Sequence, residues 1–303
     1  MEIVVLRNVY KFFGEKHAVE DLSFSVPKGQ IFGLLGPNGA GKTTTLRMIM
    51  RILLPDQGTI QVFGNTLAPS MVNRIGYMPE ERGLYKKMKV FDCVAFFGEL
   101  KGLSPERARK KAKEWLSRFE LSEWAQKKIG ELSKGMQQKV QFILTVLHEP
   151  ELLILDEPFS GLDPVNVDEM KNMLLEMKNN GTTIIFSSHQ MEQVEKLCDA
   201  ICLIHRGKNV LSGTLSEVKS KFGKNRIRIY YDGKAQFLKD RSLVLESNDF
   251  GKYVEIQPAP GVTPNALLKR AVQEISIHRF EITEPSLHDI FVQLVKNQGE
   301  QIE

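Results

Sequence analysis

The sequence predicts an α/β fold, in which a parallel β-sheet carries a phosphate-binding loop and a helical insertion, followed by a small α+β domain. Three observations predict this fold. The apolar run 31–35 leads through a glycine-rich loop into a helical pattern. The segments 152–155 and 182–186 are dominated by apolar residues, as in parallel strands covered on both faces. From about residue 219 onward, short strands and capped amphipathic helices follow without a chemical motif.

Length and composition limit the possibilities further. The 303 residues suit about two domains of ~150 residues each, and we place them at 1–218 and 219–303. The net charge of +4 is shared equally between these parts, so neither is a basic domain and we expect no nucleic-acid partner. No apolar run approaches the ~20 residues that cross a bilayer, so a membrane function would require a partner chain.

The elements before the insertion are short. We expect strands at 3–6 and 22–26, and an alternating edge strand at 59–64. A further short strand begins at Ile75 and runs into a loop. Phe13 precedes the phosphate loop, where an exposed aromatic ring can stack on a purine, although a single aromatic residue more often packs in a core.

Residues from about 86 to 148 form the predicted helical insertion. Ser104 and Ser133 are typical helix N-caps, and each precedes an amphipathic pattern. In the last domain we expect strands at 227–231 and 253–256 and a helix capped by Thr263. These helices and strands give that domain a core but no chemistry.

The glycine-rich loop has the pattern G-x-x-x-x-G-K-T. Its glycines allow the backbone N–H groups to surround an anion, and the following helix adds its positive end. Lys42 can reach the outer phosphates, and the hydroxyl of Thr43 suits a Mg²⁺ ion that bridges them. The nucleotide-binding residues predicted here are Gly36, Pro37, Asn38, Gly39, Ala40, Gly41, Lys42, Thr43 and Thr44. A glycine-rich turn without a ligand is the alternative.

Two carboxylates follow the strand 152–155. Ligands of parallel sheets lie beyond the carboxyl ends of the strands, which is where Asp156 and Glu157 fall. Asp156 is the natural second Mg²⁺ ligand, and Glu157 can orient or deprotonate the attacking water. Two acids after a strand can also serve as a helix cap or a solvated turn, but the phosphate loop favours the catalytic interpretation.

A second anion site is predicted at Ser133 and Gly135, at the start of a helix. One triphosphate is already held by the phosphate loop. Two phosphate sites in one chain make sense if two chains face each other and each covers the nucleotide of the other.

These motifs, in this order, resemble the ATP-binding-cassette (ABC) family over residues 1–218. The phosphate loop is similar to Walker A, 152–157 to Walker B with its catalytic glutamate, and Leu132–Met136 to the signature motif. The resemblance implies a P-loop NTPase core, with Asp163 in the D-loop, His189 as the switch histidine and Phe13 as the adenine-stacking aromatic. It also implies ATP and Mg²⁺ as ligands.

Two positions depart from the family pattern. Lys134 and Met136 replace a glycine and a glutamine of the signature motif, while the phosphate-facing Ser133 and Gly135 remain. Glu80 stands where the family has the glutamine of the Q-loop, and we assign it a catalytic and metal-binding role. The alternative is that Glu80 turns away and pairs with Arg82 or Lys86.

The run 80–85 and the end 284–291 resemble a bacterial subgroup of exporters, whose relatives serve sodium efflux and drug resistance. The resemblance implies an ATPase subunit at the cytoplasmic face of the membrane. Two ATP molecules would close a homodimer, or a pair with a related second subunit, and hydrolysis would reopen it and drive a separate integral-membrane permease. The alternatives are a soluble ABC ATPase acting on DNA or ribosomes, or a regulatory module without turnover.

The loop and helix at 77–102 supply the predicted docking surface for the permease. The residues proposed for this surface are Tyr85, Val90, Phe91, Val94, Phe96 and Phe97. Packing within the helical insertion is the alternative for any one of them.

Overall fold

The computed structural model describes residues 1–66, 68–81, 83–222 and 226–297. The chain divides into two compact units, Met1–Gly213 and Thr214–Glu303, which are described separately. The domain boundary predicted near residue 218 lies within helix α7 (Leu215–Lys221). No helix in the described ranges is both long enough and apolar enough to span a bilayer.

The first unit is built on a six-stranded sheet of order β5-β6-β7-β3-β8-β9. Its strands are β3 (Ile31–Leu35), β5 (Ile75–Met78), β6 (Leu152–Asp156), β7 (Thr183–Ser188), β8 (Ala200–His205) and β9 (Lys208–Thr214). The pairs β5–β6, β6–β7, β7–β3 and β3–β8 are parallel. Every residue of β3, β6 and β7 is buried, as expected for strands covered on both faces.

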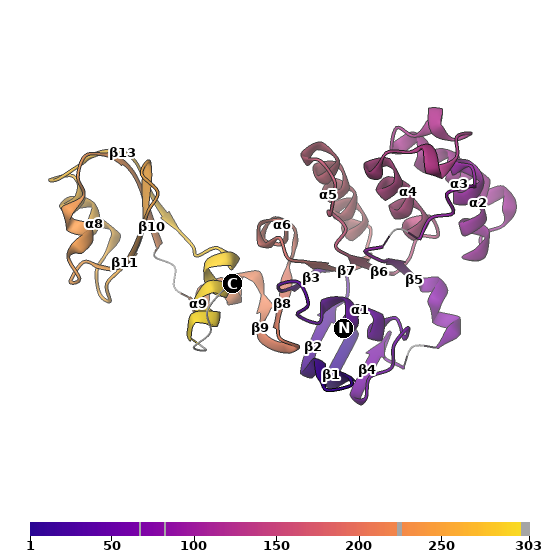
Figure 1. Cartoon of the computed structure of the whole chain (residues 1–303), viewed down its shortest axis with the longest axis horizontal. Coiled ribbons are helices and arrows are strands. Elements are labelled where there is room, and N and C mark those ends of the chain that lie inside the picture. The colour runs from indigo at the N-terminus through magenta and orange to yellow at the C-terminus, as the bar shows by residue number, and fades with distance from the viewer. Residues whose placement is uncertain (67, 82, 223–225, 298–303) are drawn as a thin grey trace. The chain divides into compact units, whose positions relative to one another are not determined.

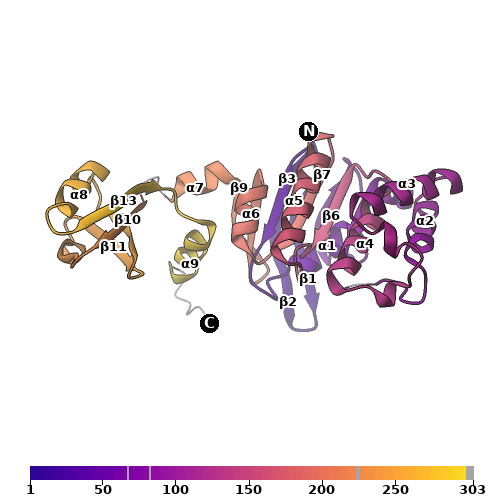
Figure 2. The same cartoon turned by 90° about the horizontal axis from the view of Figure 1, so that it is seen from above.

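Helices cover both faces of this sheet. α5 (Pro164–Asn179) and α6 (Met191–Leu197) lie on one face, and α1 (Lys42–Ile49) lies on the other (Figures 1 and 2). On the side of α1 a second, antiparallel sheet of order β2-β1-β4 completes the layer. A predicted parallel α/β core is therefore confirmed.

Two strands of the second sheet are longer than predicted, and the predicted edge strand 59–64 begins two residues earlier. β1 (Glu2–Phe13) and β2 (Lys16–Pro27) each have 12 residues, and β4 is Gln57–Val62. Their pairing shifts register at several points, and Asn8 and Asp21 adopt left-handed φ values of 47° and 48°. The Asn8 side-chain amide donates to Asp21 Oδ1 at 2.8 Å. These irregularities break the alternation of apolar residues, which is why the sequence pattern predicted only two short pieces.

One apolar core joins the two sheets to α1. Val4 and Leu22 of the antiparallel sheet, Leu34 and Ile154 of the parallel sheet and Leu46 of α1 are all fully buried in it. Full burial of one such side chain contributes about 1.5–3 kcal/mol to stability. The loop between β3 and α1 is therefore fixed at both of its ends.

The helical insertion contains α2 (Val90–Leu100), α3 (Pro105–Arg118) and α4 (Lys134–Val146). The predicted caps are confirmed: Ser104 Oγ accepts from the Arg107 N–H, and Ser133 Oγ accepts from the Met136 N–H. Part of the predicted docking surface is wrong. Val90 and Val94 are fully buried, because this i, i+4 stripe of α2 faces the interior of the insertion.

The remaining members of the predicted docking surface are accessible. Tyr85 is 55% exposed and Phe96 43% exposed, while Phe91 and Phe97 are half-buried. The ring of Phe97 lies beside both exposed rings, with centroids 6.1 Å from Tyr85 and 5.9 Å from Phe96. These four residues, Tyr85, Phe91, Phe96 and Phe97, are called the aromatic patch below.

The second unit is a four-stranded antiparallel sheet of order β11-β12-β10-β13. Its elements are α7, β10 (Arg226–Asp232), β11 (Val244–Asp249), β12 (Tyr253–Pro258), α8 (Pro264–Ala271), β13 (Ser276–Thr283) and α9 (Leu287–Asn297). Ile227, Ile229, Val254 and Ile256 are fully buried on one face of this sheet, in a core that includes Leu267 of α8. A small α+β domain with its own core was predicted and is confirmed.

Candidate functional site

The phosphate loop takes its shape from glycines at both ends. Gly36 has φ of 149° and Gly41 has φ of 107°. A Cβ atom at these positions would lie 2.1 Å from the Ile204 carbonyl oxygen and 2.4 Å from that of Ala18. Only glycine fits such close backbone approaches. Gly41 is also the N-cap of α1 and supplies no side-chain cap, so the helix start is open to an external acceptor.

Lys42 turns its side chain back into this loop. Its ammonium group donates to the carbonyl oxygens of Gly36 at 2.8 Å and Pro37 at 3.0 Å. The same nitrogen lies 3.6 Å from Glu157 Oε1, and both side chains are more than nine-tenths buried. A buried cation and a buried carboxylate thus meet where the loop faces the end of β6.

The Asp156 carboxylate lies between the phosphate loop and the end of β7. Its Oδ1 accepts hydrogen bonds from Thr43 Oγ1 at 3.1 Å and Ser187 Oγ at 2.6 Å. Its Oδ2 is buried and has no hydrogen-bond partner among the described residues. An unpartnered buried carboxylate oxygen beside a threonine hydroxyl fits a hard cation such as Mg²⁺, which prefers oxygen ligands.

Glu157 follows at the point where the chain turns sharply away from β6. Its φ of 49° lies in the left-handed region, which a glutamate rarely adopts. Its N–H donates to Ser187 Oγ at 2.9 Å, and its Oε2 lies 3.0 Å from His189 Nδ1. The structure therefore brings Lys42, Glu157 and His189, predicted from three separate motifs, into one contiguous set.

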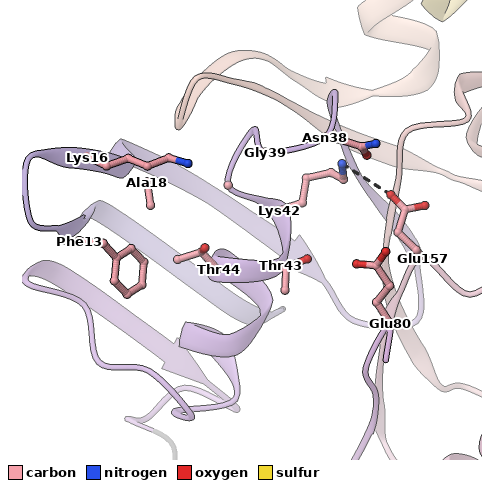
Figure 3. Close-up of a pocket in the computed structure, with 11 residues that line it drawn as sticks. Phe13, Lys16, Ala18, Asn38, Gly39, Lys42, Thr43, Thr44, Glu80 and Glu157 are labelled. Atoms are coloured by element: carbon pink, nitrogen blue, oxygen red, sulfur yellow. Dashed lines mark ion pairs between the residues drawn. The ribbon is translucent and has the colours of Figure 1, made fainter. Parts of the chain in front are cut away.

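Lys42, Thr43 and Glu157 line an elongated cavity of about 430 Å³ (Figure 3), and Asp156 and His189 contact these lining residues from outside the cavity wall. Phe13, which is 49% exposed, lies at one end of this cavity, while Glu80 and Glu157 lie near Thr43 at the other. The predicted residues that line the cavity are Phe13, Asn38, Gly39, Gly41, Lys42, Thr43, Thr44, Glu80 and Glu157. An aromatic ring at one end and charged groups at the other match the two ends of a nucleoside triphosphate.

Two lining residues were missed by the sequence analysis. Lys16 and Ala18 of β2 lie beside Phe13 in the cavity wall. They belong to no motif, and their place follows from the β1–β2 pairing, in which Phe13 is opposite Lys16. Ser187 was missed as well, although a serine directly after the apolar run 184–186 is a usable signal.

Predicted residues of the signature motif and the D-loop lie in a different hollow. Ser133, Gly135, Gly161 and Asp163 line a cavity of about 400 Å³ that shares no residue with the first. Asp163 caps α5, and its Oδ1 accepts from the Asn166 N–H at 3.0 Å. Hydrogen bonds from Asn166 lower the pKa of this carboxyl group. The signature and D-loop residues are thus brought together, but away from the phosphate loop of the same chain.

Comparison with known proteins agrees with this arrangement. A model of the ABC transporter family matches residues 19–160, and a model of the C-terminal domain of DrrA1-3-like ATP-binding proteins matches residues 213–295. The uncharacterized ABC transporter ATP-binding protein YhaQ of Bacillus subtilis (strain 168) is 46% identical over 293 residues, which is 97% of this chain and 98% of that protein.

Two further relatives extend the comparison. The linearmycin resistance ATP-binding protein LnrL of Bacillus subtilis (strain 168) is 33% identical, covering 95% of this chain and 96% of that protein. A solved structure of the ATP-binding subunit of an ABC transporter superposes with a TM-score of 0.68 at 30% identity, covering 73% of this chain and 93% of that one. The chain therefore belongs to the ABC transporter family as an ATP-binding subunit with a DrrA-like C-terminal domain.

Proposed function

We propose that this chain hydrolyses ATP as one half of a dimer and thereby drives export through a separate membrane permease. The observation that carries the hydrolytic part is the contact set Lys42–Glu157–His189 beside Thr43 and Asp156. A phosphate-binding cation, a candidate base and a metal-binding pair meet at one end of a nucleotide-sized cavity.

The nucleotide is bound along the cavity. Phe13 offers a half-exposed ring on which adenine stacks, and the loop N–H groups with the start of α1 hold the phosphates. Lys42 exchanges its contacts with the carbonyl oxygens of Gly36 and Pro37 for contacts with the β- and γ-phosphates. The loop glycines, Asn38 and Thr44 shape this cradle.

Thr43 and Asp156 would hold Mg²⁺, with Glu80 as a third oxygen donor at the cavity wall. The ion would neutralise charge on the phosphates and polarise the terminal phosphoryl group. The buried Oδ2 of Asp156 supports this assignment, because it has no hydrogen-bond partner among the described residues and an ion would supply one.

Glu157 acts on the attacking water. Its carboxylate lies between Lys42 and His189, so it is already directed toward the place where the terminal phosphate binds. His189 is 42% exposed in its side chain and reaches the same place from β7, where its ring can contact the γ-phosphate. The carboxylate orients the water and accepts its proton as the water oxygen bonds to the γ-phosphorus, while the bond from that phosphorus to the oxygen of the β-phosphate breaks and ADP leaves.

The dimer follows from the separation of the two cavities. Ser133, Gly135 and Asp163 do not line the nucleotide cavity of their own chain. A second copy, or a related ATPase subunit, would place its signature hollow over the ATP of this chain. The signature hollow of this chain would in turn cover the ATP of the partner. Hydrolysis removes the γ-phosphate contacts of both chains, and the pair reopens.

The aromatic patch is the proposed contact with the permease, which would hold the chain at the cytoplasmic face of the membrane. Aromatic side chains are enriched where protein interfaces gain most of their binding energy. The resistance function of LnrL supports an exporter, because a permease that removes a toxic compound confers resistance. The alternative is an ATPase that acts on DNA or ribosomes. The charge of the chain argues against it, because neither domain is basic.

The test of hydrolysis is the release of phosphate from ATP by the purified chain and by its Lys42→Ala variant. The wild type should show Mg²⁺-dependent turnover. Turnover by Lys42→Ala should be at least about a hundredfold lower, because the variant lacks the positive charge that contacts the phosphates during transfer. Equal turnover of both proteins would refute the assignment of this cavity.

A further inference from the structure

Ser187 is a buried hydroxyl that the proposed mechanism has not used. It is fully buried near the end of β7, after the apolar residues 184–186. A buried hydroxyl costs free energy unless it is hydrogen-bonded. Its Oγ makes two hydrogen bonds: it donates to Asp156 Oδ1 at 2.6 Å and accepts from the Glu157 N–H at 2.9 Å. One atom therefore links the metal-binding carboxylate to the peptide of the candidate base.

The first hydrogen bond fixes the rotation of the Asp156 carboxylate. The terminal torsion of an aspartate is soft, so the carboxylate needs partners to keep one orientation. Ser187 and Thr43 both donate to Oδ1, which leaves Oδ2 as the buried oxygen without a partner. In the proposed function Thr43 also binds the ion. Ser187 is therefore the residue whose hydrogen bond to Asp156 Oδ1 is kept when the ion binds.

The second hydrogen bond holds the backbone of Glu157. A left-handed glutamate persists only where its surroundings hold it there, and the Glu157 N–H is held by Ser187. Two residues further along the same chain, His189 contacts the carboxylate of Glu157. The end of β7 thus holds Glu157 at both its backbone and its side chain.

We propose that Ser187 is a positioning residue that sets the metal-binding oxygen of Asp156 and the turn that directs Glu157. This inference rests on the proposed function, because it assigns Ser187 a role toward Mg²⁺ and the attacking water. Ser187 touches neither ligand and acts through its two neighbours.

Ser188 provides a matched control. It is the adjacent residue of the same strand, it is 2% exposed, and its Oγ accepts from the Gln190 N–H at 3.0 Å. Replacing Ser188 by alanine also removes a buried hydroxyl and one hydrogen bond at this strand end, but leaves Asp156 and Glu157 untouched.

The experiment measures binding of a fluorescent ATP analogue as a function of Mg²⁺ in the Glu157→Gln background, where hydrolysis is blocked. Ser187→Ala should raise the Mg²⁺ concentration for half-maximal binding about tenfold, the usual effect of losing a group that orients a metal ligand. Binding without Mg²⁺ should change less than about twofold. Ser188→Ala should leave both values unchanged, and Ser187→Thr, which keeps the hydroxyl, should restore the Mg²⁺ dependence.

Ser187→Cys, which has a similar volume and a weak donor, replaces the alanine variant if that variant does not fold. The same Mg²⁺ dependence in the Ser187 and Ser188 variants would overturn the proposal, whatever their melting temperatures. If Ser187→Ala binds ATP normally without Mg²⁺ and its Mg²⁺ concentration for half-maximal binding does not change, the positioning role of Ser187 is rejected while the proposed function stands. Absence of ATP binding in the wild type would reject the proposed function and this inference together.

Discussion

At the scale of single residues, Glu80 lines the phosphate-loop cavity, and the backbone on both sides of it is held by hydrogen bonds. Gln141 Nε2 of α4 donates to the carbonyl oxygens of Pro79 at 2.8 Å and Glu81 at 3.4 Å. Among the described residues Glu80 forms no ion pair with Lys86, and Arg82 lies outside these residues. A carboxylate held at the cavity wall attracts Mg²⁺ and repels the γ-phosphate.

Glu80→Gln tests this balance. The amide removes the negative charge and adds donors, so ATP without Mg²⁺ should bind about fivefold tighter, as expected for an exposed charge contact of about 1 kcal/mol. The Mg²⁺ requirement for turnover should relax as well. Mg²⁺ titrations of ATP binding and phosphate release check this. Superimposable curves for the two proteins would show that the carboxylate does not act on the ligand.

The sequence could predict most of the site at this scale, because its residues belong to motifs with fixed spacing. Lys42, Thr43, Asp156, Glu157 and His189 were predicted in this way, and the structure brings them together. Their individual roles stay predictions. Lys16 was missed because it belongs to no motif and reaches the cavity only through the β1–β2 pairing, in which it lies opposite Phe13. Ser187 was missed because its hydrogen bonds go to Asp156 and Glu157, which lie much earlier in the chain, and spacing does not encode such contacts.

At the scale of elements, the junction between α4 and β5 holds a half-buried histidine whose surroundings disfavour the protonated imidazole. His148 follows α4, and its Nε2 donates to the Ile75 carbonyl oxygen at 3.2 Å while its Nδ1 is buried without a hydrogen-bond partner in the described ranges. Burial, and then the nearby charge of Lys101, lower the pKa of His148 to about 4. The ordinary pKa of 6.5 applies in the unfolded chain, which therefore takes up this proton at higher pH.

This difference predicts a pH dependence. The contribution of neutral His148 to folding is present above about pH 6.5 and is lost as pH falls toward about 4. His148→Gln keeps an amide donor for Ile75 and removes the titration, so its melting temperature should fall less than that of the wild type between about pH 7 and pH 5. Parallel melting curves across this range would contradict the buried neutral state.

The aromatic patch makes a second prediction at the scale of elements. Phe96→Glu should weaken association with membranes that contain the permease at least about tenfold, since it places a charge in the middle of an apolar contact, while ATP turnover of the isolated chain should change less than about twofold. Leu175, which lies on α5 and is 38% exposed, provides the control, and Leu175→Glu should change neither membrane association nor ATP turnover. Sedimentation with membranes checks this, and equal behaviour of the two variants would remove the patch from the interface.

The element pattern shows where sequence reasoning ends. The buried strands β3, β6 and β7 and the capped helices α3 and α8 were predicted because apolar runs and caps are local signals. β11 and β13 were not, because most of their residues are exposed or half-buried and carry little apolar alternation. They are strands because β12 and β10 pair with them, and that pairing is a tertiary property.

At the scale of the whole molecule, we propose an arrangement in which two chains share two ATP molecules. It rests on the two separate cavities, one with the phosphate loop and one with the signature and D-loop residues. Because the signature hollow shares no lining residue with the phosphate-loop cavity, we expect its residues to act on the nucleotide of a second chain. The second unit has its own core.

The molar mass of the Glu157→Gln variant, with and without ATP, tests this two-chain arrangement most directly. It is measured by size-exclusion chromatography with light scattering. The variant should bind ATP, lose hydrolysis and change from one chain to two when ATP and Mg²⁺ are present, because the γ-phosphate contacts are no longer removed. Lys42→Ala in the same background should stay a single chain. A Glu157→Gln protein that remains a single chain with ATP bound, and still hydrolyses it, would contradict the account.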